Sequence, residues 1–298
     1  MMKKAGMNSV TLGVFAWAAY EPREGEYNFT WLREIMDRLY DQGIYTELAT
    51  PTGAKPNWLA RKYPEVLRVQ SNGVRDHQGM RHNHCLTSPI YRQKVEELLN
   101  HMIDAVGDHP GLILWHISNE LGGECYCPLC QAAFRDWLKA KYKTLDSLNH
   151  AWWTDFWSHT YTDWSQINAP APHGEMNVHG LVLDWKRFVT HQTVDFMSME
   201  RDAVKSVNPE IPVTANLMGF YDGLDYFKFG PALDVVSWDN YPQWHTTDNT
   251  EIAVSSAMAH DVMRSVKHEN FLLMESTPSM TNWTPVSMLK RPGMHLLS

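Results

Sequence analysis

The sequence of 298 residues contains no run of about 18 apolar residues, so it predicts no membrane-spanning helix. It also has no dense patch of Lys and Arg, and its net charge is −8, which disfavours nucleic acid as a partner. The N-terminus lacks a signal-peptide pattern, and the chain has no internal repeat or low-complexity tract. We therefore expect a globular, cytoplasmic protein with neither a membrane nor a nucleic acid as its partner.

A glycine-rich fingerprint after the first predicted strand is also absent, which disfavours a doubly wound, dinucleotide-binding sheet. Instead, short β-rich runs alternate with helical patterns, and this alternation is typical of parallel βαβ units. The predicted strands are residues 9–15, 44–50, 111–120, 212–219, 234–240 and 270–277. The predicted helices are residues 30–43, 88–110, 128–142, 182–209 and 251–267.

Several of the predicted strands end in polar side chains. These strand ends are Asn119-Glu120, Asn216, Asp239-Asn240 and Glu275. In a (β/α)8 barrel the residues that carry the chemistry lie at the carboxyl ends of the strands. The sequence therefore predicts an α/β protein of the (β/α)8 class, also called a TIM barrel.

Cysteine is scarce, with four in the whole chain: Cys85, Cys125, Cys127 and Cys130. Three of them lie within the six residues "CYCPLC", and this spacing suits a tetrahedral zinc site with four thiolate ligands. Free buried thiols are the alternative, and His82 and His84 are competing ligands. A disulfide fits a cytosolic setting poorly. Catalysis by the metal is not expected, because four thiolates leave no position for water and no H-x-E motif precedes "CPLC".

Aromatic residues are frequent at 12%, including 13 Trp, and many of them lie beside polar residues in predicted loops. Residues 145–177 form a Trp-rich stretch that we interpret as a segment inserted into the barrel domain, which spans residues 1–298. Core packing is the ordinary role of such side chains. Stacking on the flat face of a sugar ring is the functional alternative.

Two glutamates follow apolar runs of the same design. Glu120 ends "GLILWHISNE" and Glu275 ends "NFLLME", 155 positions later (275 − 120). Glycoside hydrolysis needs two carboxyl groups, one to protonate the leaving oxygen and one to attack the anomeric carbon or to activate water. A structural role, as a helix cap or an arginine partner, is the alternative for each glutamate alone. A non-catalytic sugar-binding protein would not need both.

The segment "WHISNELGGECYCPLCQAAFRDWLKAKYKTLDSLNHAWWTDFWSHTYTDW" resembles glycoside hydrolase family 42, the β-galactosidases. "VTLGVFAWAAYEPREGEYNF", "RHNHCLTSPIYR" and "ESTPSMTNW" match the same family in the same order. The resemblance implies a (β/α)8 barrel that hydrolyses terminal β-galactosides with retention, with Glu120 as acid/base and Glu275 as nucleophile. Alternatives are an α-L-arabinopyranosidase, a β-glucosidase-like enzyme or an inactive sugar-binding fragment.

The resemblance also carries individual residues over. Arg81 matches an arginine that hydrogen-bonds the sugar, Asn119 the asparagine before the acid/base, and Trp283 a tryptophan that lines the galactose subsite. Tyr241 is expected to support the nucleophile. Arg81 as a surface cation and Trp283 as a core residue are the alternatives. Many family members bind structural zinc at a similar cysteine cluster.

The chain departs from the family pattern at both ends. Family members begin with an additional strand and end their barrel with an eighth, and neither is found here. The usual downstream domains, one of which helps to form a homotrimer in full-length relatives, are not found either. An open sheet exposes edges and apolar surface. We therefore expect this chain, by itself, to be poorly stable and inactive.

Overall fold

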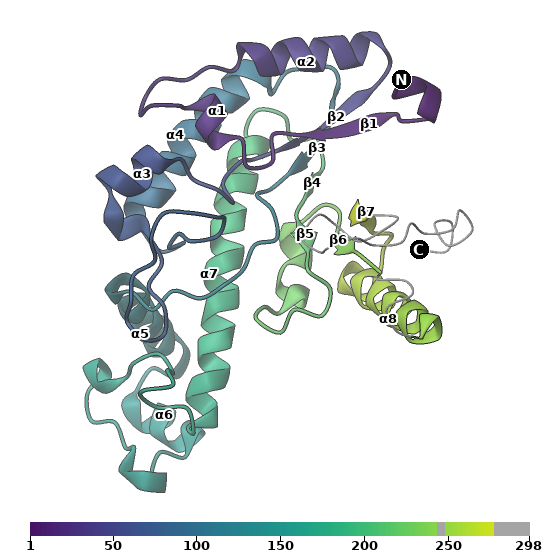
Figure 1. Cartoon of the computed structure of the whole chain (residues 1–298). Coiled ribbons are helices and arrows are strands. Elements are labelled where there is room, and N and C mark those ends of the chain that lie inside the picture. The colour runs from purple at the N-terminus through teal and green to yellow at the C-terminus, as the bar shows by residue number, and fades with distance from the viewer. Residues whose placement is uncertain (243–247, 277–298) are drawn as a thin grey trace.

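The structure is a computed structural model that describes residues 1–242 and 248–276, and its centre is a set of parallel strands (Figure 1). The strands are β1 (Ser9–Leu12), β2 (Tyr45–Ala49), β3 (Leu112–His116), β4 (Val213–Thr214), β5 (Asn216–Leu217), β6 (Ser237–Asn240) and β7 (Leu272–Ser276). They pair in the order β1-β2-β3-β4 and β5-β6-β7, and every pair is parallel. Only Ala215 separates β4 from β5, so these two strands lie on one of the six predicted segments.

The α-helices alternate with the strands, as the hydrophobic patterns predict. They are α1 (Trp17–Tyr20), α2 (Thr30–Asp41), α3 (Asn57–Lys62), α4 (Pro89–Val106), α5 (Pro128–Tyr142), α6 (Leu145–Trp152), α7 (His179–Lys205) and α8 (Asn249–Lys267). The described residues also contain short 3-10 turns: η1 (Lys3–Ala5), η2 (Pro64–Val66), η3 (Phe156–Ser158), η4 (Trp164–Gln166), η5 (Tyr226–Lys228) and η6 (Gly230–Ala232).

Local sequence sets several helix boundaries. Helix α4 begins with the predicted Ser-Pro pair, because the Ser88 hydroxyl accepts from the Tyr91 N–H at 3.3 Å and Pro89 needs no hydrogen-bond partner. Asp248 caps α8 in the same way, by accepting from the Thr250 N–H at 2.8 Å. Helix α2 ends two residues before Gly43, whose φ of 66° begins the turn into β2.

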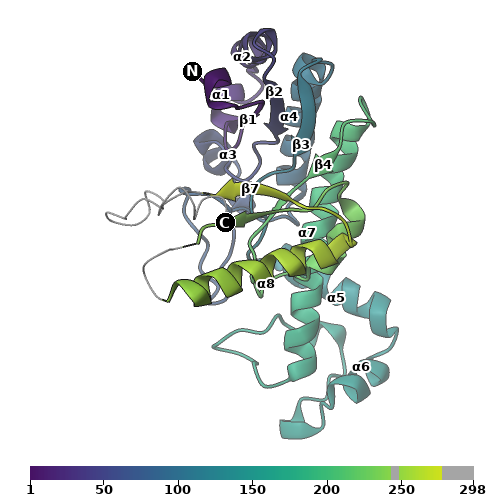
Figure 2. The same ribbon diagram turned by 90° about the vertical axis from the view of Figure 1, so that its right-hand side faces the viewer.

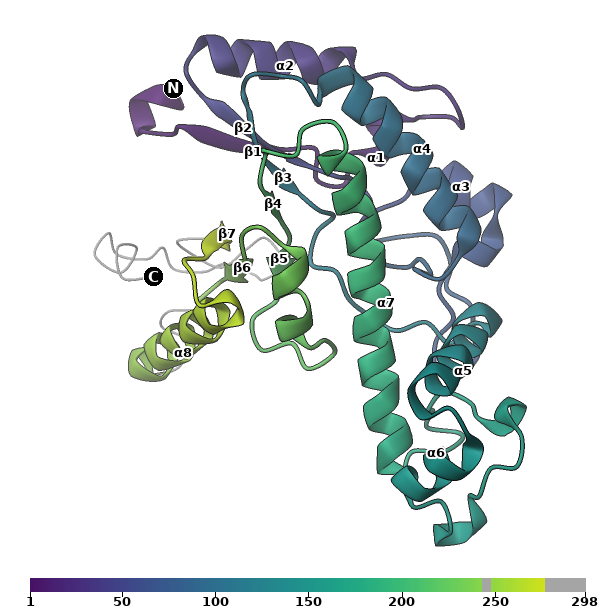
Figure 3. The same cartoon turned by 180° about the vertical axis from the view of Figure 1, so that it is seen from behind.

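The helices cover the strands on one side. Figures 1 and 3 show α2, α4 and α7 along one face of β1–β4, whereas α8 lies beside β6 and β7. The view in Figure 2 shows α8 running along the side of β7, the last strand of the three-stranded sheet β5-β6-β7. Strand β6 is buried along its whole length, and Trp115 of β3 is 1% exposed. Burial on both faces is typical of barrel strands, which lie between a packed interior and outer helices.

The predicted end of the third strand is wrong. The third strand was expected to reach Glu120 but ends at His116, because Ser118 and Glu120 have φ angles of 53° and 41°, which a strand cannot accommodate.

The Trp-rich segment 145–177 contains α6, η3 and η4 and lies at the far end of α5 and α7, away from the sheet (Figure 1). Trp152 is buried there, and its indole N–H lies 3.1 Å from the Asp184 carboxylate of α7. Trp153 and Trp157 are 69% and 67% exposed. Core packing therefore accounts for Trp152 but for neither of these two neighbours.

Membrane insertion finds no support in the helices. Within residues 1–242 and 248–276, none combines the length and the apolar character that crossing a bilayer requires.

Candidate active site

The carboxyl ends of β3, β5, β6 and β7 meet at one edge of the sheet. Asn216 lies on β5, Asp239 on β6 and Glu275 on β7, where Asp239 and Glu275 are register partners. Glu120 follows β3 by four residues. The sheet therefore gathers three carboxylates from distant parts of the sequence.

Asn216 connects these groups. Its amide N–H bonds point to Asp239 Oδ2 at 2.7 Å and to Glu275 Oε1 at 3.2 Å. Its carbonyl oxygen accepts from the Glu120 backbone N–H at 2.7 Å and lies 2.9 Å from His116 Nε2. One amide therefore fixes the backbone of Glu120 and the side chains of Asp239 and Glu275.

Glu120 sits on a left-handed turn with an arginine beside it. Its side chain is 16% exposed, and Arg81 Nη2 lies 2.6 Å from Glu120 Oε2. In the amide orientation that satisfies both of its groups, Asn119 accepts from Arg81 Nη1 at 3.1 Å and donates to Glu275 Oε1 at 3.1 Å. Arg81 and Asn119 therefore lie beside the two glutamates.

Glu275 receives hydrogen bonds from several sides. The Tyr241 hydroxyl donates to Glu275 Oε2, and the amides of Asn216 and Asn119 donate to Oε1. Burial, the hydrogen bond to Glu275 and its negative charge raise the pKa of Tyr241, so this phenol stays neutral. Three neutral donors therefore fix the orientation of this carboxylate.

Asp239 is a third carboxyl group that the sequence-based choice of site residues missed. It is 8% exposed, and burial, followed by the charges of Glu275 and Glu120, raises its pKa to about 8. His116 was missed as well, and burial lowers its pKa, so the ring is neutral. The polar ends of the apolar strands signalled Asn216 and Asp239, but were used only for the fold.

A second buried carboxyl supports the turn of Glu120 from behind. Thr50, directly after β2, accepts from the Ser118 N–H at 2.6 Å and donates to Glu200 of α7. Thr52 donates to Glu200 at 2.6 Å. Glu200 is fully buried, and burial raises its pKa to about 7 against the two hydroxyl hydrogen bonds that lower it. This group was also missed, because nothing in the helical pattern of α7 distinguishes it.

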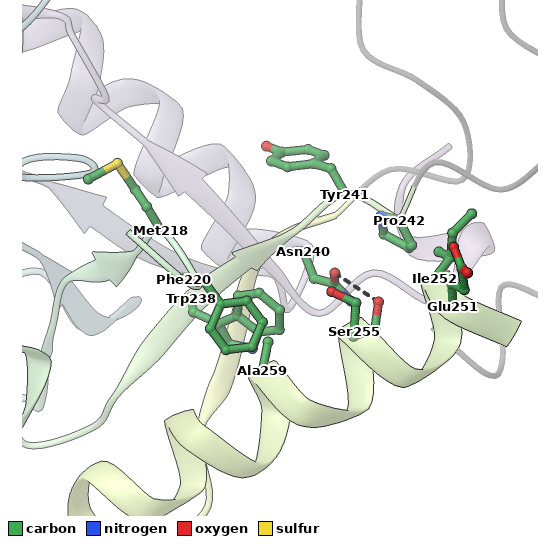
Figure 4. Close-up of a pocket in the computed structure, with 12 residues that line it drawn as sticks. Met218, Phe220, Trp238, Asn240, Tyr241, Pro242, Glu251, Ile252, Ser255 and Ala259 are labelled. Carbon is green, nitrogen blue, oxygen red and sulfur yellow. Dashed lines mark hydrogen bonds between the residues drawn. The ribbon is translucent and has the colours of Figure 1, made fainter. Parts of the chain in front are cut away.

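A cavity of about 440 Å³ adjoins the carboxylates between β6 and α8 (Figure 4). Trp238, Asn240 and Tyr241 line it from β6 and the residue that follows, with Phe220 and part of α8 opposite. The Ser256 hydroxyl of α8 donates to Asn240 at 3.4 Å across this space. We call Glu120, Asp239 and Glu275, together with the Asn216 that bonds to them, the carboxylate group. Neither Glu120 nor Glu275 lines the cavity, and Tyr241 joins the cavity to this group through its hydrogen bond to Glu275.

The four cysteines converge on one point, and we call them the thiol cluster. All four are buried, and their sulfur atoms lie within 4.8 Å of one another. Cys85 Sγ is 3.6 Å from Cys127 and 3.4 Å from Cys130, and Cys127 and Cys130 are 3.7 Å apart. His82 and His84 do not belong to this group of described ligand atoms, and His84 instead stacks on Tyr91.

The thiol cluster is close in sequence to the candidate active site. Cys85 follows Arg81 by four residues, and Cys125 follows Glu120 by five. Between Glu120 and Cys125 lies Gly123, which has a φ of 85°, and a Cβ at this position would collide with the Arg68 guanidinium. Only glycine suits that position. The remaining predicted site residue, Trp283, lies outside the described residues.

Comparison with known proteins gives consistent matches over the whole chain. The glycoside hydrolase family 42 model, described as β-galactosidase, matches residues 1–298. β-Galactosidase BglY of Alicyclobacillus acidocaldarius is 59% identical over 298 residues, which are 100% of this chain and 43% of that protein. β-Galactosidase GanA of Bacillus subtilis is 50% identical and is covered to 46%. The chain therefore spans less than half the length of these curated relatives.

Solved structures agree with the sequence matches. The cold-adapted β-galactosidase of Rahnella sp. R3 superposes with a TM-score of 0.97 at 52% identity, covering 99% of this chain and 44% of that one. A catalytic mutant of Gan42B, a family 42 β-galactosidase of G. stearothermophilus, gives 0.95 at 52% identity, with the same coverage. The predicted (β/α)8 class, with fewer than eight strands in the described residues, is confirmed. The chain belongs to glycoside hydrolase family 42, the β-galactosidase family.

Proposed function

We propose that the protein carrying this chain hydrolyses terminal β-D-galactosides with retention of configuration. The observation that carries the proposal is the joint anchoring of Glu120 and Glu275 by Asn216 at the carboxyl ends of the strands. Two fixed carboxyl groups at one site are what a retaining glycosidase requires, at a separation of about 5–5.5 Å. The names of the relatives supply the sugar, since each is called a β-galactosidase.

The hydrogen bonds support different roles for the two glutamates. Glu275 accepts from Tyr241, Asn216 and Asn119, and these three donors hold its oxygens in one orientation, as a nucleophile requires. Glu120 is the other proposed catalytic carboxyl group, and its side chain is 16% exposed. We assign it the proton transfers of both steps. It gives its proton to the leaving oxygen in the first step and takes one from water in the second.

The reaction then balances in two displacements. A Glu275 oxygen bonds to the anomeric carbon while the bond to the leaving oxygen breaks and Glu120 protonates that oxygen. Water, deprotonated by Glu120, next attacks the same carbon and releases Glu275. Arg81 and Asn119 would bind sugar hydroxyls beside the reacting carbon, since their polar groups face the two carboxylates.

The test is hydrolysis of 4-nitrophenyl β-galactoside by wild type and Glu275→Ala, each in the full protein that carries this chain. Truncation of the nucleophile should lower kcat by at least about 10⁴-fold. Azide should restore turnover and yield α-galactosyl azide, because it occupies the space of the missing carboxylate. The exposed Glu210→Ala is the matched control and should keep wild-type activity.

Two outcomes would contradict the proposal. Unchanged activity in Glu275→Ala would show that the site is misplaced. Hydrolysis of an α-L-arabinopyranoside or a β-glucoside in preference to the galactoside would keep the mechanism and replace the sugar.

A structural Zn²⁺ in the thiol cluster is also part of the proposal. Four sulfurs at about 2.3 Å from a tetrahedral zinc lie about 3.8 Å apart. The three pairs among Cys85, Cys127 and Cys130 are 3.4 to 3.7 Å apart, and the Cys125 sulfur lies within 4.8 Å of the other three. When bound, the ion would hold the segment that carries Arg81 to the segment that carries Glu120. It would take no part in the chemistry, because four thiolates fill its coordination shell.

The proposal also covers the cellular location and the oligomeric state of the protein. The thiols of the described residues form no disulfide, which supports a cytoplasmic location. A homotrimer of the full-length protein is proposed from the family resemblance alone.

A further inference from the structure

Asp239 is unusual among the carboxyl groups of the site because it pairs with no cation and one of its buried oxygens meets no donor. Arg81 pairs with Glu120, and none of the ion pairs between described residues includes Asp239. Its Oδ2 accepts from Asn216 at 2.7 Å. Its Oδ1 is buried and meets no donor in the described part of the chain, and the carboxyl group faces that of Glu120. A buried carboxylate oxygen without a donor is poorly solvated, whereas a protonated carboxyl group needs less compensation.

The surroundings of Asp239 add negative charge only. The titratable groups that face it are Glu120, Glu275, His116, Tyr226 and Tyr241. Burial makes both tyrosines and the histidine neutral, since it raises the pKa of each phenol and lowers that of the imidazole. On the other side of β6, His260 of α8 pairs with the Trp238 indole instead. Glu120 and Glu275 therefore dominate the electrostatic field at Asp239.

The hydrogen bond from Asn216 gives Asp239 a role in the geometry. The bond to Asp239 is shorter than the bond from the same amide to Glu275, at 2.7 against 3.2 Å. With its nitrogen directed to these two acceptors, the amide must direct its oxygen to the Glu120 backbone N–H. Asp239 thereby fixes which way Asn216 faces.

We propose that Asp239 is a positioning residue that acts as a neutral, protonated carboxyl group: it orients Asn216 between the two glutamates without adding a third negative charge to the site. The inference rests on the proposed glycosidase function and concerns the same site. A pKa near 8 agrees with it, because the group is then mostly protonated at neutral pH.

The test compares Asp239→Asn with Asp239→Ala in the full protein, by kcat and KM for 4-nitrophenyl β-galactoside. An asparagine side chain reproduces the shape and neutrality of the protonated carboxyl, so kcat should stay within about threefold of wild type at pH 7. Alanine frees the Asn216 amide to turn, and kcat should fall by about 10–100-fold with little change in KM.

The pH profile separates this role from a merely structural one. Wild type loses the neutral form of Asp239 as the pH rises from 7 to 9, and Asp239→Asn has nothing to lose there. The ratio of kcat/KM of Asp239→Asn to that of wild type should therefore rise by up to about tenfold over this interval. Asp234→Asn is the matched control, because Asp234 binds Lys205 and the Val213 N–H at the opposite end of the strands. Its ratio should not change with pH.

Two results would overturn the inference. The first is a loss of activity or of folding in Asp239→Asn as large as in Asp239→Ala, since a neutral mimic must be accepted. The second is a flat pH ratio. If wild type does not hydrolyse the galactoside at all, the proposed function fails and the inference with it. An active wild type with either adverse result would overturn the inference alone.

Discussion

The thiol cluster and the carboxylate group occupy neighbouring segments but are assembled in different ways. Three of the four thiols come from the six residues 125–130, so most of the cluster is set by local chain geometry. Glu120, Asn216, Asp239 and Glu275 come from the ends of four strands, and they meet only when β3 through β7 are in register. A one-residue slip of a strand would turn its side chain to the opposite face.

Because the two regions are built differently, we expect them to govern different properties of the protein, stability in one case and reaction rate in the other. The thiol cluster should control stability, because the proposed metal would join two loops in the folded state. The carboxylate group should control the rate, because its like charges and buried polar groups are arranged for a reaction rather than for folding. Variants in one region should therefore leave the property governed by the other region nearly intact.

The variant Glu120→Ala should show the largest difference between its effect on the reaction rate and its effect on stability. Loss of the general acid should reduce kcat by about 10²–10⁴-fold for a galactoside with a poor leaving group, such as a methyl glycoside. A dinitrophenyl galactoside, whose leaving group needs no proton, should lose far less in the first step. The melting temperature and the zinc content should stay at wild-type values, and the comparison with Glu210→Ala corrects for preparation effects.

Equal losses with both leaving groups would contradict the assignment of Glu120 as the acid. A lowered zinc content in Glu120→Ala would instead show that the two regions are coupled more closely than their separate bonding indicates.

The next effect in size is expected from Cys127→Ser. Removing one of four thiolates should abolish stoichiometric zinc binding and lower the melting temperature by on the order of 10 °C, because loss of a structural metal removes several kcal/mol of stability. Metal analysis and thermal denaturation measure these two changes. Activity per folded molecule, assayed well below the melting temperature, should fall much less.

Thr87→Val is the control for that variant. The Thr87 hydroxyl lies 3.2 Å from Cys130 Sγ without offering a thiolate, so zinc should remain bound. Zinc retained in Cys127→Ser, or a wild type that contains none, would refute the proposed metal site.

The same contrast explains which features of the protein can be predicted from its sequence. Periodicity identified the six strand segments and the five long helices, because apolar spacing and the helix cap at Ser88 act locally. The cysteine spacing located the thiol cluster, and two apolar strands pointed to Glu120 and Glu275. The wrong end of the third strand came from apolar residues that continue past His116, although Ser118 and Glu120 turn into the left-handed region.

The missed residues needed three-dimensional information. That Asn216 joins Glu120 to Glu275 depends on the register of β5, β6 and β7, and that Asp239 lacks a cation depends on where Arg81 points. Neither property can be predicted from a short stretch of sequence. Tyr241 and Asn119 were found through family resemblance, whose motifs carry such long-range information indirectly.

The smallest effect, and the sharpest test of the carboxylate group's support, is expected from Glu200→Gln. Glu200 has a pKa of about 7 in the folded protein against 4.5 for the ordinary side chain, so the folded state binds more protons between these values. The free energy of unfolding from this group therefore falls as the pH rises from 4.5 to 7, by up to about 3 kcal/mol. Glutamine cannot ionise and lacks this decline.

Urea denaturation at pH 5 and pH 8 measures the difference directly. The stability of Glu200→Gln relative to wild type should increase between these two pH values by most of that amount, whereas Glu210→Gln, on the surface, should show a constant difference. A constant difference for Glu200→Gln would mean that Glu200 is ionised at both pH values and accepts the Thr50 and Thr52 hydroxyls as a buried anion. In that case the turn of Glu120 would rest on a permanent buried charge, and Asp239 would be the one carboxyl group of this region, among the described residues, that burial keeps neutral.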